Sequence, residues 1–288
     1  MKNFNFNIKK RPQPILTIGL PVFNEEKKIN KVLTSLYNQT YKKFIIIISD
    51  NCSNDKTLKI CKKWKKKKTN LVIFSQKKKL KINQNFYFVY SKSKTNYFMW
   101  MAADDFKSKN FIKDNLNFLE KNPKYSASCC KNIRETNKFK KLKTIDFKIT
   151  GNMSSKYSKF FNHCFESHGV FYSVFRRIDL TRSKKYLNYM AWDWIVNLLI
   201  LENGDFNRLK KGYLKSTHGG ISTRPNYLFN SSDNLIHKIF PFYKFTTFVL
   251  NNAFKNDFSL NNFLNIWFNI FKINFRYLKR QFKYKFTN

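Results

Sequence analysis

Short apolar runs alternate with amphipathic segments over the first third of the chain. The apolar runs carry almost no polar residues, as expected of strands that helices cover on both faces, and they occupy residues 15–20, 44–48, 71–74 and 97–101. Between the first two runs, apolar residues recur at helical spacing at Ile29, Val32, Leu33 and Leu36. This spacing predicts a helix over about 25–38 that Asn24 can cap.

Helical patterns also follow the second and third runs. Leu58, Cys61 and Trp64 share one side of a second predicted helix, and residues 83–94 form a third. Strands that alternate with helices in this way predict an α/β fold with a parallel sheet and right-handed crossovers. The lysine run 65–68 is expected to be a solvated helix end.

The pattern weakens beyond about residue 125. Residues 129–148 are compatible with strands or a loop, and 169–177 is expected to be a strand that leads into a helix. A strongly apolar helix is predicted over 190–201, and the Phe-, Tyr-, Ile-, Lys- and Asn-rich segment from 235 onward is predicted to be helical. The expected organisation is an N-terminal tail (1–12), a first half (13–125), a second half (126–230) and a helical C-terminal region (231–288).

Composition allows a sizeable core, because 42% of the 288 residues are hydrophobic. The formal net charge of +39 would suit a nucleic-acid-binding protein or an anionic membrane. However, 47 of the 56 basic residues are lysine, and Asn, Ile and Phe are also abundant, as expected from A/T-rich codons. A selected phosphate-binding surface would favour arginine, so we expect no specific nucleic-acid partner.

The cysteines and the N-terminus bear on localisation. The 5 cysteines are odd in number and lack CxxC spacing, which supports neither a disulfide framework nor a zinc site. No signal peptide is recognisable, and no apolar stretch reaches the ~18 to 20 residues that span a bilayer. A cytoplasmic protein is therefore expected, with peripheral association at the inner face of the plasma membrane as an option.

Polar residues that could bind a ligand or a metal follow the apolar runs. Asn24 and Glu25 follow the first run, Asp50 the second, and Asp104 and Asp105 the fourth. The carboxyl ends of parallel strands meet at one edge of a sheet, where nucleotides bind. A carboxylate pair there suits Mg²⁺ or Mn²⁺ held jointly with phosphate oxygens, although a solvated turn or a helix cap is the alternative.

Three motifs in this order resemble the nucleotide-sugar-binding half of family 2 glycosyltransferases of the GT-A fold. They are Pro-x-x-Asn-Glu after the first strand, Ser-Asp-Asn-x-Ser-x-Asp-x-Thr after the second, and Ala-Asp-Asp after the fourth, within residues 15 to about 122. The resemblance implies a Rossmann-like, mostly parallel sheet flanked by helices, and a nucleotide-diphosphate-sugar donor. It also implies nucleotide-binding roles for Pro21, Val22, Phe23, Glu25, Asp50, Lys81, Asn85 and Asp104, with Asp50 accepting a hydrogen bond from the base.

The metal motif departs from the commoner Asp-x-Asp-Asp, because Ala102 replaces the first Asp. Asp104 and Asp105 remain as the expected ligands of a divalent metal that stabilises charge on the departing diphosphate. Because of this substitution, a catalytically degenerate protein that binds sugar nucleotides without turnover stays an alternative.

The second half supplies candidates for the acceptor side. Asp193 is our candidate for the general base that takes the acceptor hydroxyl proton, the alternative being a helix-dipole charge. Trp192 and Trp194 can stack on sugars, but large aromatics are more often core residues. His168 and His218 are weaker candidates for the acceptor site and for a mobile loop, and a structural role for each is the more common outcome.

Basic and aromatic residues are interleaved in the tail, where Trp267, Phe271 and Phe275 lie among Lys272 and Arg276. This mixture suits an anionic membrane surface, and a helix packed on the catalytic domain is the equal alternative. The sequence as a whole predicts an inverting, metal-assisted glycosyltransferase that acts on a glycan or lipid-linked acceptor. A basic nucleic-acid-binding protein is the rival, and it lacks any recognisable nucleic-acid motif.

Overall fold

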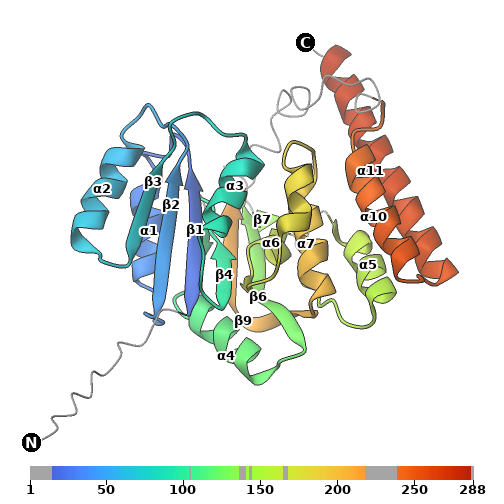
Figure 1. Cartoon of the computed structure of the whole chain (residues 1–288), viewed down its shortest axis with the longest axis horizontal. Coiled ribbons are helices and arrows are strands. Elements are labelled where there is room, and N and C mark those ends of the chain that lie inside the picture. The colour runs from blue at the N-terminus through green and yellow to red at the C-terminus, as the bar shows by residue number, and fades with distance from the viewer. Residues whose placement is uncertain are drawn as a thin grey trace, which may run out of the picture.

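A single mixed sheet forms the centre of the protein. The computed structural model describes residues 15–103, 105–135, 141–142, 145–164, 168–217 and 239–286. The strand order is β3-β2-β1-β4-β8-β6-β9-β5, and β7 pairs with β6. Helices lie on both sides of this sheet, and two long helices stand at the end opposite β3 (Figure 1). The predicted α/β class with a helical C-terminal region is therefore confirmed.

The first half is the parallel βα unit that the hydrophobic pattern predicts. Its strands are β1 (Leu16–Val22), β2 (Phe44–Asp50), β3 (Leu71–Ser75) and β4 (Tyr97–Trp100), and its helices are α1 (Ile29–Tyr37), α2 (Thr57–Lys67) and α3 (Ile82–Ser91). β1 pairs in parallel with both β2 and β4, and β2 pairs in parallel with β3. Val22 lies opposite Asp50, and Asp50 lies opposite Ser75, so the carboxyl ends of three strands are level with one another.

Helix α1 differs from its prediction at its start. It begins at Ile29 rather than near Glu25, and its N-cap residue is Lys28 without a side-chain hydrogen bond. Asn24 does not cap the helix: it has a φ of 54° and lies in the loop before the helix. The polar residues 24–26 are instead engaged by the neighbouring loop, which explains why the helical pattern does not extend back to them.

The second half continues the same sheet with mixed pairings, because β6 pairs in parallel with β9 and the other strand pairs are antiparallel. Its elements are β5 (Phe106–Lys107), α4 (Phe111–Lys121), β6 (Tyr125–Glu135), β7 (Lys141–Leu142), α5 (Met153–Asn162), α6 (His168–Phe171), β8 (Val174–Arg176), η2 (Thr181–Tyr186), α7 (Trp192–Glu202) and β9 (Asp205–Thr217). The predicted order of strand then helix at 169–177 is wrong, because the short helix α6 precedes strand β8. β8 lies between β4 and β6 and pairs antiparallel with both.

The C-terminal helices pack on the second half of the sheet domain. They are α10 (Tyr243–Lys255) and α11 (Leu260–Phe286). The Trp194 ring of α7 stacks on Phe242 with centroids 5.6 Å apart, and Asn265 of α11 donates a hydrogen bond to Ser158 Oγ of α5 at 2.6 Å. The C-terminal region therefore shares contacts with α5 and α7, far from β1–β3 (Figure 1). Within the described part of the chain, no helix combines the length and the apolarity that a membrane span requires.

Candidate active site

Two loops at the carboxyl ends of β1 and β2 are joined by reciprocal hydrogen bonds. Backbone N–H groups of the first loop donate to the second: Glu25 N to Thr57 Oγ1 (2.7 Å) and Glu26 N to Asp55 Oδ2 (3.1 Å). In return, Lys56 N donates to Glu26 Oε2 (2.9 Å). Asn24 also takes part, since its N–H donates to Ser53 Oγ and its Oδ1 accepts from Asn54 N. The polar motif residues around positions 24–26 and 51–57 thus fix both loops before any ligand binds.

Asp55 shows the strength of this junction. Burial acts to raise the pKa of Asp55, but hydrogen bonds from the Thr57 hydroxyl and from the N–H groups of Thr57 and Glu26 outweigh it, and the pKa is lowered. Asp55 therefore stays ionised and acts as an acceptor for both loops.

Asp50 lies at the end of β2 with its carboxylate enclosed by these loops. The residue is 1% exposed, and its Oδ2 accepts a hydrogen bond from Ser53 N at 3.2 Å. Its Oδ1 is buried and has no hydrogen-bond partner among the described residues. Burying a carboxylate oxygen without a hydrogen-bond partner costs free energy. A ligand that donates a hydrogen bond to Oδ1 would recover part of this cost.

The end of β1 contributes an exposed aromatic ring to the same edge of the sheet. Pro21 and Val22 are the last residues of β1, paired with Ser49 and Asp50, and both are buried. Phe23 follows them and is 37% exposed, with Lys79 Nζ 3.9 Å from its ring centroid. Phe23 is thus an exposed ring at the same edge of the sheet as the buried Asp50.

The loop between β3 and α3 closes the same edge with a group of exposed lysines, namely Lys77, Lys78, Lys79 and Lys81. Asn51 fixes this loop, because its Oδ1 accepts from Leu80 N (2.7 Å) and its Nδ2 donates to Leu80 O (2.9 Å). Lys81 precedes α3, and its backbone N–H donates to Gln84 Oε1. Four positive charges are therefore held at the carboxyl ends of β2 and β3.

Asn85 lies one turn into α3 and is buried against β2. Its Oδ1 accepts from Ser49 Oγ at 2.6 Å and its Nδ2 donates to Ser49 O at 3.2 Å. The amide is thus already engaged by the strand that carries Asp50. In this arrangement Asn85 positions the end of β2.

The carboxylate motif follows β4. Asp104 lies outside the described residues. Asp105 is buried, and the residue that follows it begins β5, which pairs antiparallel with β9. The backbone N–H of Asp105 donates to Ala102 O at 3.4 Å, which keeps Asp105 in the turn that follows β4.

Lys107 lies two residues further and is buried beneath this motif. Burial lowers the pKa of Lys107, and the charge of Asp105 opposes that shift. Its Nζ lies 5.0 Å from the Phe111 ring centroid, and it has no hydrogen-bond partner in the described ranges. No sequence pattern marks this residue, because one lysine among 47 cannot be distinguished by type.

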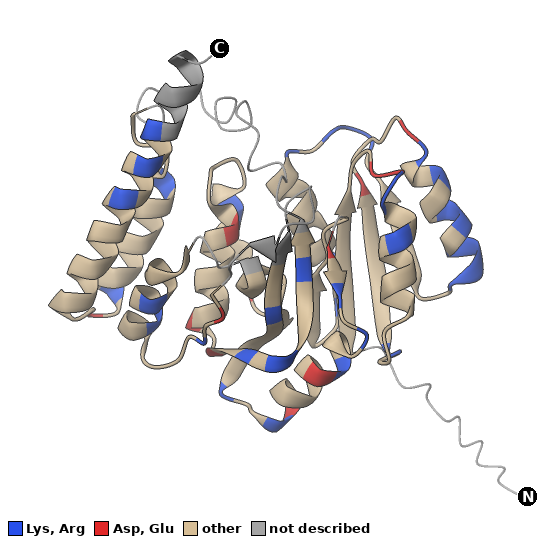
Figure 2. Ribbon diagram, turned by 180° about the vertical axis from the view of Figure 1, so that it is seen from behind, with Lys and Arg blue, Asp and Glu red and all other residues tan. Residues whose placement is uncertain are grey.

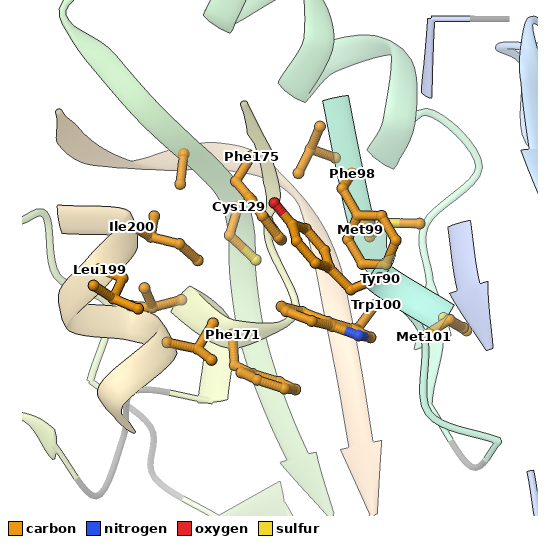
Figure 3. Close-up of a cluster of buried hydrophobic side chains, with 14 of the residues drawn as sticks. Tyr90, Phe98, Met99, Trp100, Met101, Cys129, Phe171, Phe175, Leu199 and Ile200 are labelled. Carbon is orange, nitrogen blue, oxygen red and sulfur yellow. The ribbon is translucent and has the colours of Figure 1, made fainter. Parts of the chain in front are cut away.

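A cluster of buried aromatic rings joins β4 to the second half. The Trp100 and Phe171 rings stack with centroids 4.5 Å apart, and Trp192 meets both edge-on at 6.1 and 6.0 Å. Trp100 Nε1 also donates to Phe86 O of α3 at 3.0 Å. Figure 3 shows Trp100 and Phe171 face to face beside Tyr90 and Phe175. The cluster brings the end of α6 and the start of α7 to the carboxyl end of β4.

Asp193 is the residue that follows Trp192 of this cluster. It occupies the first turn of α7, directly after the buried Trp192, and its side chain is exposed. Ala191 precedes the helix in the left-handed region, with a φ of 58°, so the chain turns sharply before the acidic residue. Asp193 thus follows the ring that packs on Trp100, the last residue of β4.

The two tryptophans pack inside the protein. Trp192 is fully buried against Trp100 and Phe171, and Trp194 contacts Phe242 and Phe245 of the C-terminal region. Their packing favours the core alternative over sugar stacking. His168 begins α6, but its side chain is outside the described part, and His218 lies outside the described residues altogether.

Arg208 of β9 lies close to Gly169 of the short helix α6. Its buried guanidinium donates from Nη1 to Cys130 O at 2.7 Å, and its Nε lies 3.6 Å from Asp146 Oδ1. A Cβ at Gly169 would lie only 2.4 Å from Nη1, so a side chain there would displace the Arg208 guanidinium. An isolated arginine belongs to no motif, so the sequence pattern does not indicate its role.

Comparison with known proteins identifies the family. A model of the family described as "Glycosyl transferase family 2" matches residues 17–179, more than half of the chain. The chain belongs to glycosyl transferase family 2. The predicted resemblance is therefore confirmed, and the matched segment contains the two joined loops, the Ala-Asp-Asp motif and α6.

Two curated relatives match part of this family 2 chain. A Methanococcus voltae protein named dolichyl N-acetyl-alpha-D-glucosaminyl phosphate 3-beta-D-2,3-diacetamido-2,3-dideoxy-beta-D-glucuronosyltransferase is 30% identical over 151 residues, which is 50% of this chain and 43% of the relative. An uncharacterized glycosyltransferase of Haemophilus influenzae is 28% identical over 114 residues, 40% of this chain and 35% of the relative. The chain spans less than half the length of these relatives.

Among solved structures, the family 2 chain is similar to S. aureus TarS 1-349 in complex with UDP-GlcNAc. The TM-score is 0.55 at 17% identity, covering 88% of this chain and 79% of TarS 1-349. At this identity the similarity establishes the fold, which is the GT-A type predicted from the sequence.

Proposed function

We propose that this family 2 protein is an inverting glycosyltransferase that uses a nucleotide-diphosphate-sugar donor, with a divalent metal, and a glycan or lipid-linked acceptor. The observation that carries the proposal is the meeting of four segments at one edge of the sheet. These segments are the joined loops after β1 and β2, the turn with Asp105 after β4, and the first turn of α7, whose Trp192 packs on Trp100 of β4. Their residue types match the parts that such a transfer needs.

The donor nucleotide would occupy the edge formed by β1, β2 and β3. Asp50 Oδ1, buried without a partner among the described residues, would accept an N–H of the base. Phe23 would contact the base or the ribose, and Glu25 lies beside it on the same loop. The lysines of the β3–α3 loop, Lys81 included, would balance the negative diphosphate.

A divalent metal fits the donor set at the end of β4. Asp105 presents a hard carboxylate oxygen at a position fixed by β5, and Asp104 precedes it in sequence. Mg²⁺ and Mn²⁺ accept one or two protein carboxylates together with phosphate oxygens. When bound, the metal would stabilise the negative charge that develops on the leaving diphosphate.

Transfer would proceed as a single displacement. The acceptor hydroxyl oxygen forms a bond to the anomeric carbon while the bond from that carbon to the diphosphate oxygen breaks, and the configuration is inverted. Asp193 takes the hydroxyl proton, and the nucleoside diphosphate leaves with the bonding electrons. The exposed position of Asp193 at the start of α7 suits a group that must meet an incoming acceptor.

The Methanococcus voltae relative, by its name, acts on a dolichyl phosphate-linked sugar. That name supports a lipid-linked acceptor as the first class to test. A protein that binds sugar nucleotides without turnover is the second candidate, and Ala102 in place of the usual first Asp is the observation that favours it.

Binding and turnover should be measured on the same preparations. A panel of UDP-, GDP- and ADP-sugars is screened for thermal stabilisation with and without Mn²⁺, and the best donor is then offered to soluble glycans and to lipid-linked sugars. Stabilisation without release of nucleoside diphosphate to any acceptor would favour the non-catalytic candidate. No stabilisation by any sugar nucleotide would contradict the proposal.

The variant Asp193→Asn separates the base from the donor site. It should leave donor affinity unchanged and lower the transfer rate by ~10² to 10⁴-fold, the usual contribution of a general base. Asp257→Asn is the matched control, because this exposed residue lies in the turn between α10 and α11 and its φ of 46° suits asparagine. Transfer by Asp193→Asn at the rate of the control would exclude Asp193 as the base.

A further inference from the structure

Helix α11 presents chemically different faces. One face is buried against the protein and carries Ile266, Ile270, Ile273, Asn274 and Tyr277. A flanking row of asparagines binds α5, where Asn262 donates to Ser154 Oγ at 3.0 Å and Asn265 to Ser158 Oγ at 2.6 Å. These contacts fix the helix on the second half of the domain and determine which side faces outward.

The outward side carries an apolar stripe made of Leu260, Leu264, Trp267, Phe268, Phe271 and Phe275, all exposed. Trp267 is 50% exposed and Phe271 is 64% exposed, whereas isoleucine, asparagine and Tyr277 fill the inward positions. At 1.5 Å per residue the spacing of these residues places them along more than ~20 Å of helix. Large aromatic side chains gathered on one outward face mark an interaction surface.

Basic residues adjoin the apolar stripe. Lys272, Arg276 and Lys279 are exposed, and Lys272 Nζ lies 4.1 Å from the ring centroid of Phe268. Neither α10 nor α11 contains an Asp or a Glu. Figure 2 shows Lys and Arg, and no acidic residue, along the described length of α11. The surface thus combines aromatic area with positive charge alone.

We propose that this side of α11 docks on an anionic phospholipid bilayer. The aromatic rings enter the boundary between headgroups and acyl chains. The charged groups of the neighbouring lysine and arginine side chains contact the lipid phosphates. A second copy of this chain is a poorer occupant. A two-fold symmetric contact would bring the same basic residues of two chains together, in a protein whose formal net charge is +39.

This inference does not depend on the proposed chemistry, since it concerns a helix that lies apart from the joined loops (Figure 1). It would keep the enzyme at the surface where a lipid-linked acceptor resides. Failure of the membrane test therefore leaves the donor site and the transfer reaction untouched.

Vesicle flotation tests the proposal with the full chain. Vesicles of phosphatidylcholine alone are compared with vesicles that also contain phosphatidylglycerol. We expect binding to the anionic vesicles, weakened by salt. The charge variant Lys272→Gln/Arg276→Gln/Lys279→Gln should bind roughly 100-fold more weakly, because each basic residue near an anionic surface contributes about fivefold.

A matched control carries the same loss of charge elsewhere. Lys62→Gln/Lys63→Gln/Lys66→Gln changes three exposed lysines of α2, at the opposite end of the molecule (Figure 1). It should bind anionic vesicles nearly as well as the parent. An equal loss in the control would show that bulk charge, and not this face of α11, governs binding, and it would overturn the proposal.

The stripe variant Trp267→Ser/Phe271→Ser/Phe275→Ser should also lose vesicle binding while its thermal unfolding stays close to that of the parent, since all three side chains are exposed. Trp267→Phe should retain binding but lose the blue shift in fluorescence that Trp267 gives on entering the bilayer. Absence of parental binding to anionic vesicles would refute the proposal. A lipid-independent dimer in sedimentation equilibrium that the stripe variant dissociates would assign the surface to a second copy instead.

Discussion

The Asp50→Asn variant tests whether the buried carboxylate at the end of β2 recognises the nucleotide base. In the free protein, Oδ2 accepts from Ser53 N at 3.2 Å, and Oδ1 has no partner within the described ranges. Asparagine keeps one carbonyl oxygen for Ser53 and replaces the other oxygen with an amide NH₂ group. The free energy of unfolding should therefore change by less than about 1 kcal/mol.

Nucleotide binding should respond much more strongly. A hydrogen bond to a charged acceptor contributes about 1.5–3 kcal/mol, and the new NH₂ group would face a base N–H as a second donor. UDP, or the nucleoside diphosphate that binds most tightly, should bind roughly 10- to 150-fold more weakly. Calorimetric titration gives the affinity, and chemical denaturation of the same preparation gives the stability.

Asp55→Asn provides the contrast, because it changes a neighbouring aspartate with a structural role. Its carboxylate accepts from Thr57 N (2.9 Å) and Glu26 N (3.1 Å), so an amide would leave one of these donors without its partner. Hydrogen bonds lower the pKa of Asp55 against the effect of burial. Its stabilising contribution is thus present above the pKa of the unfolded state and is lost as the pH falls through the lower folded value.

The two variants should therefore differ in kind. Asp55→Asn should lower stability near neutral pH and reduce the loss of stability in acid, with a far smaller effect on UDP affinity than Asp50→Asn. If Asp50→Asn binds UDP as tightly as the parent, the base does not meet this carboxylate. If Asp50→Asn unfolds as readily as a core variant, the carboxylate is structural.

Two further predictions concern the end of β4 and the aromatic cluster. Asp105→Asn should remove the gain in UDP affinity that Mn²⁺ gives the parent, whereas the control Asp114→Asn, in the first turn of α4, should retain this gain. Calorimetric titration with and without Mn²⁺ measures the gain, and an undiminished gain in Asp105→Asn would exclude Asp105 as a metal ligand. Trp192→Ala should lower the free energy of unfolding by about 3–5 kcal/mol, because the fully buried ring packs on Trp100 and Phe171. A loss below about 1 kcal/mol in chemical denaturation would contradict this packing role.

The first half of the fold was predictable because its strands are buried on both faces and its helices are amphipathic. The apolar runs that become β1 to β4 are buried on both sides only when helices cover both faces of the sheet. The polar residues that follow them must then meet at one edge, so the neighbourhood of Asp50 and Asp105 follows from chain order. The family resemblance rests on these same residues and is confirmed by the match to residues 17–179.

The roles of individual polar residues were less predictable. Asn24 has the side chain of a helix cap, yet it joins the loop after β2, because Ser53 and Asn54 offer it partners that are distant in sequence. Asn85 matches a family position for nucleotide contact, yet its amide is bound to Ser49. The local sequence shows which hydrogen bonds a side chain is able to make. Which partner it binds depends on the loop or strand that the fold places next to it.

The sequence by itself determined the α/β class, the parallel first half, the family and the helical C-terminal region. Tertiary structure alone decided that α6 and α7 meet β4 through Trp100, Phe171 and Trp192, that Lys107 and Arg208 are buried, and which side of α11 faces outward. The physical reason is range. Hydrophobic periodicity reports the local choice between helix and strand, while contacts between residues far apart in the chain arise only when whole elements pack and exclude water.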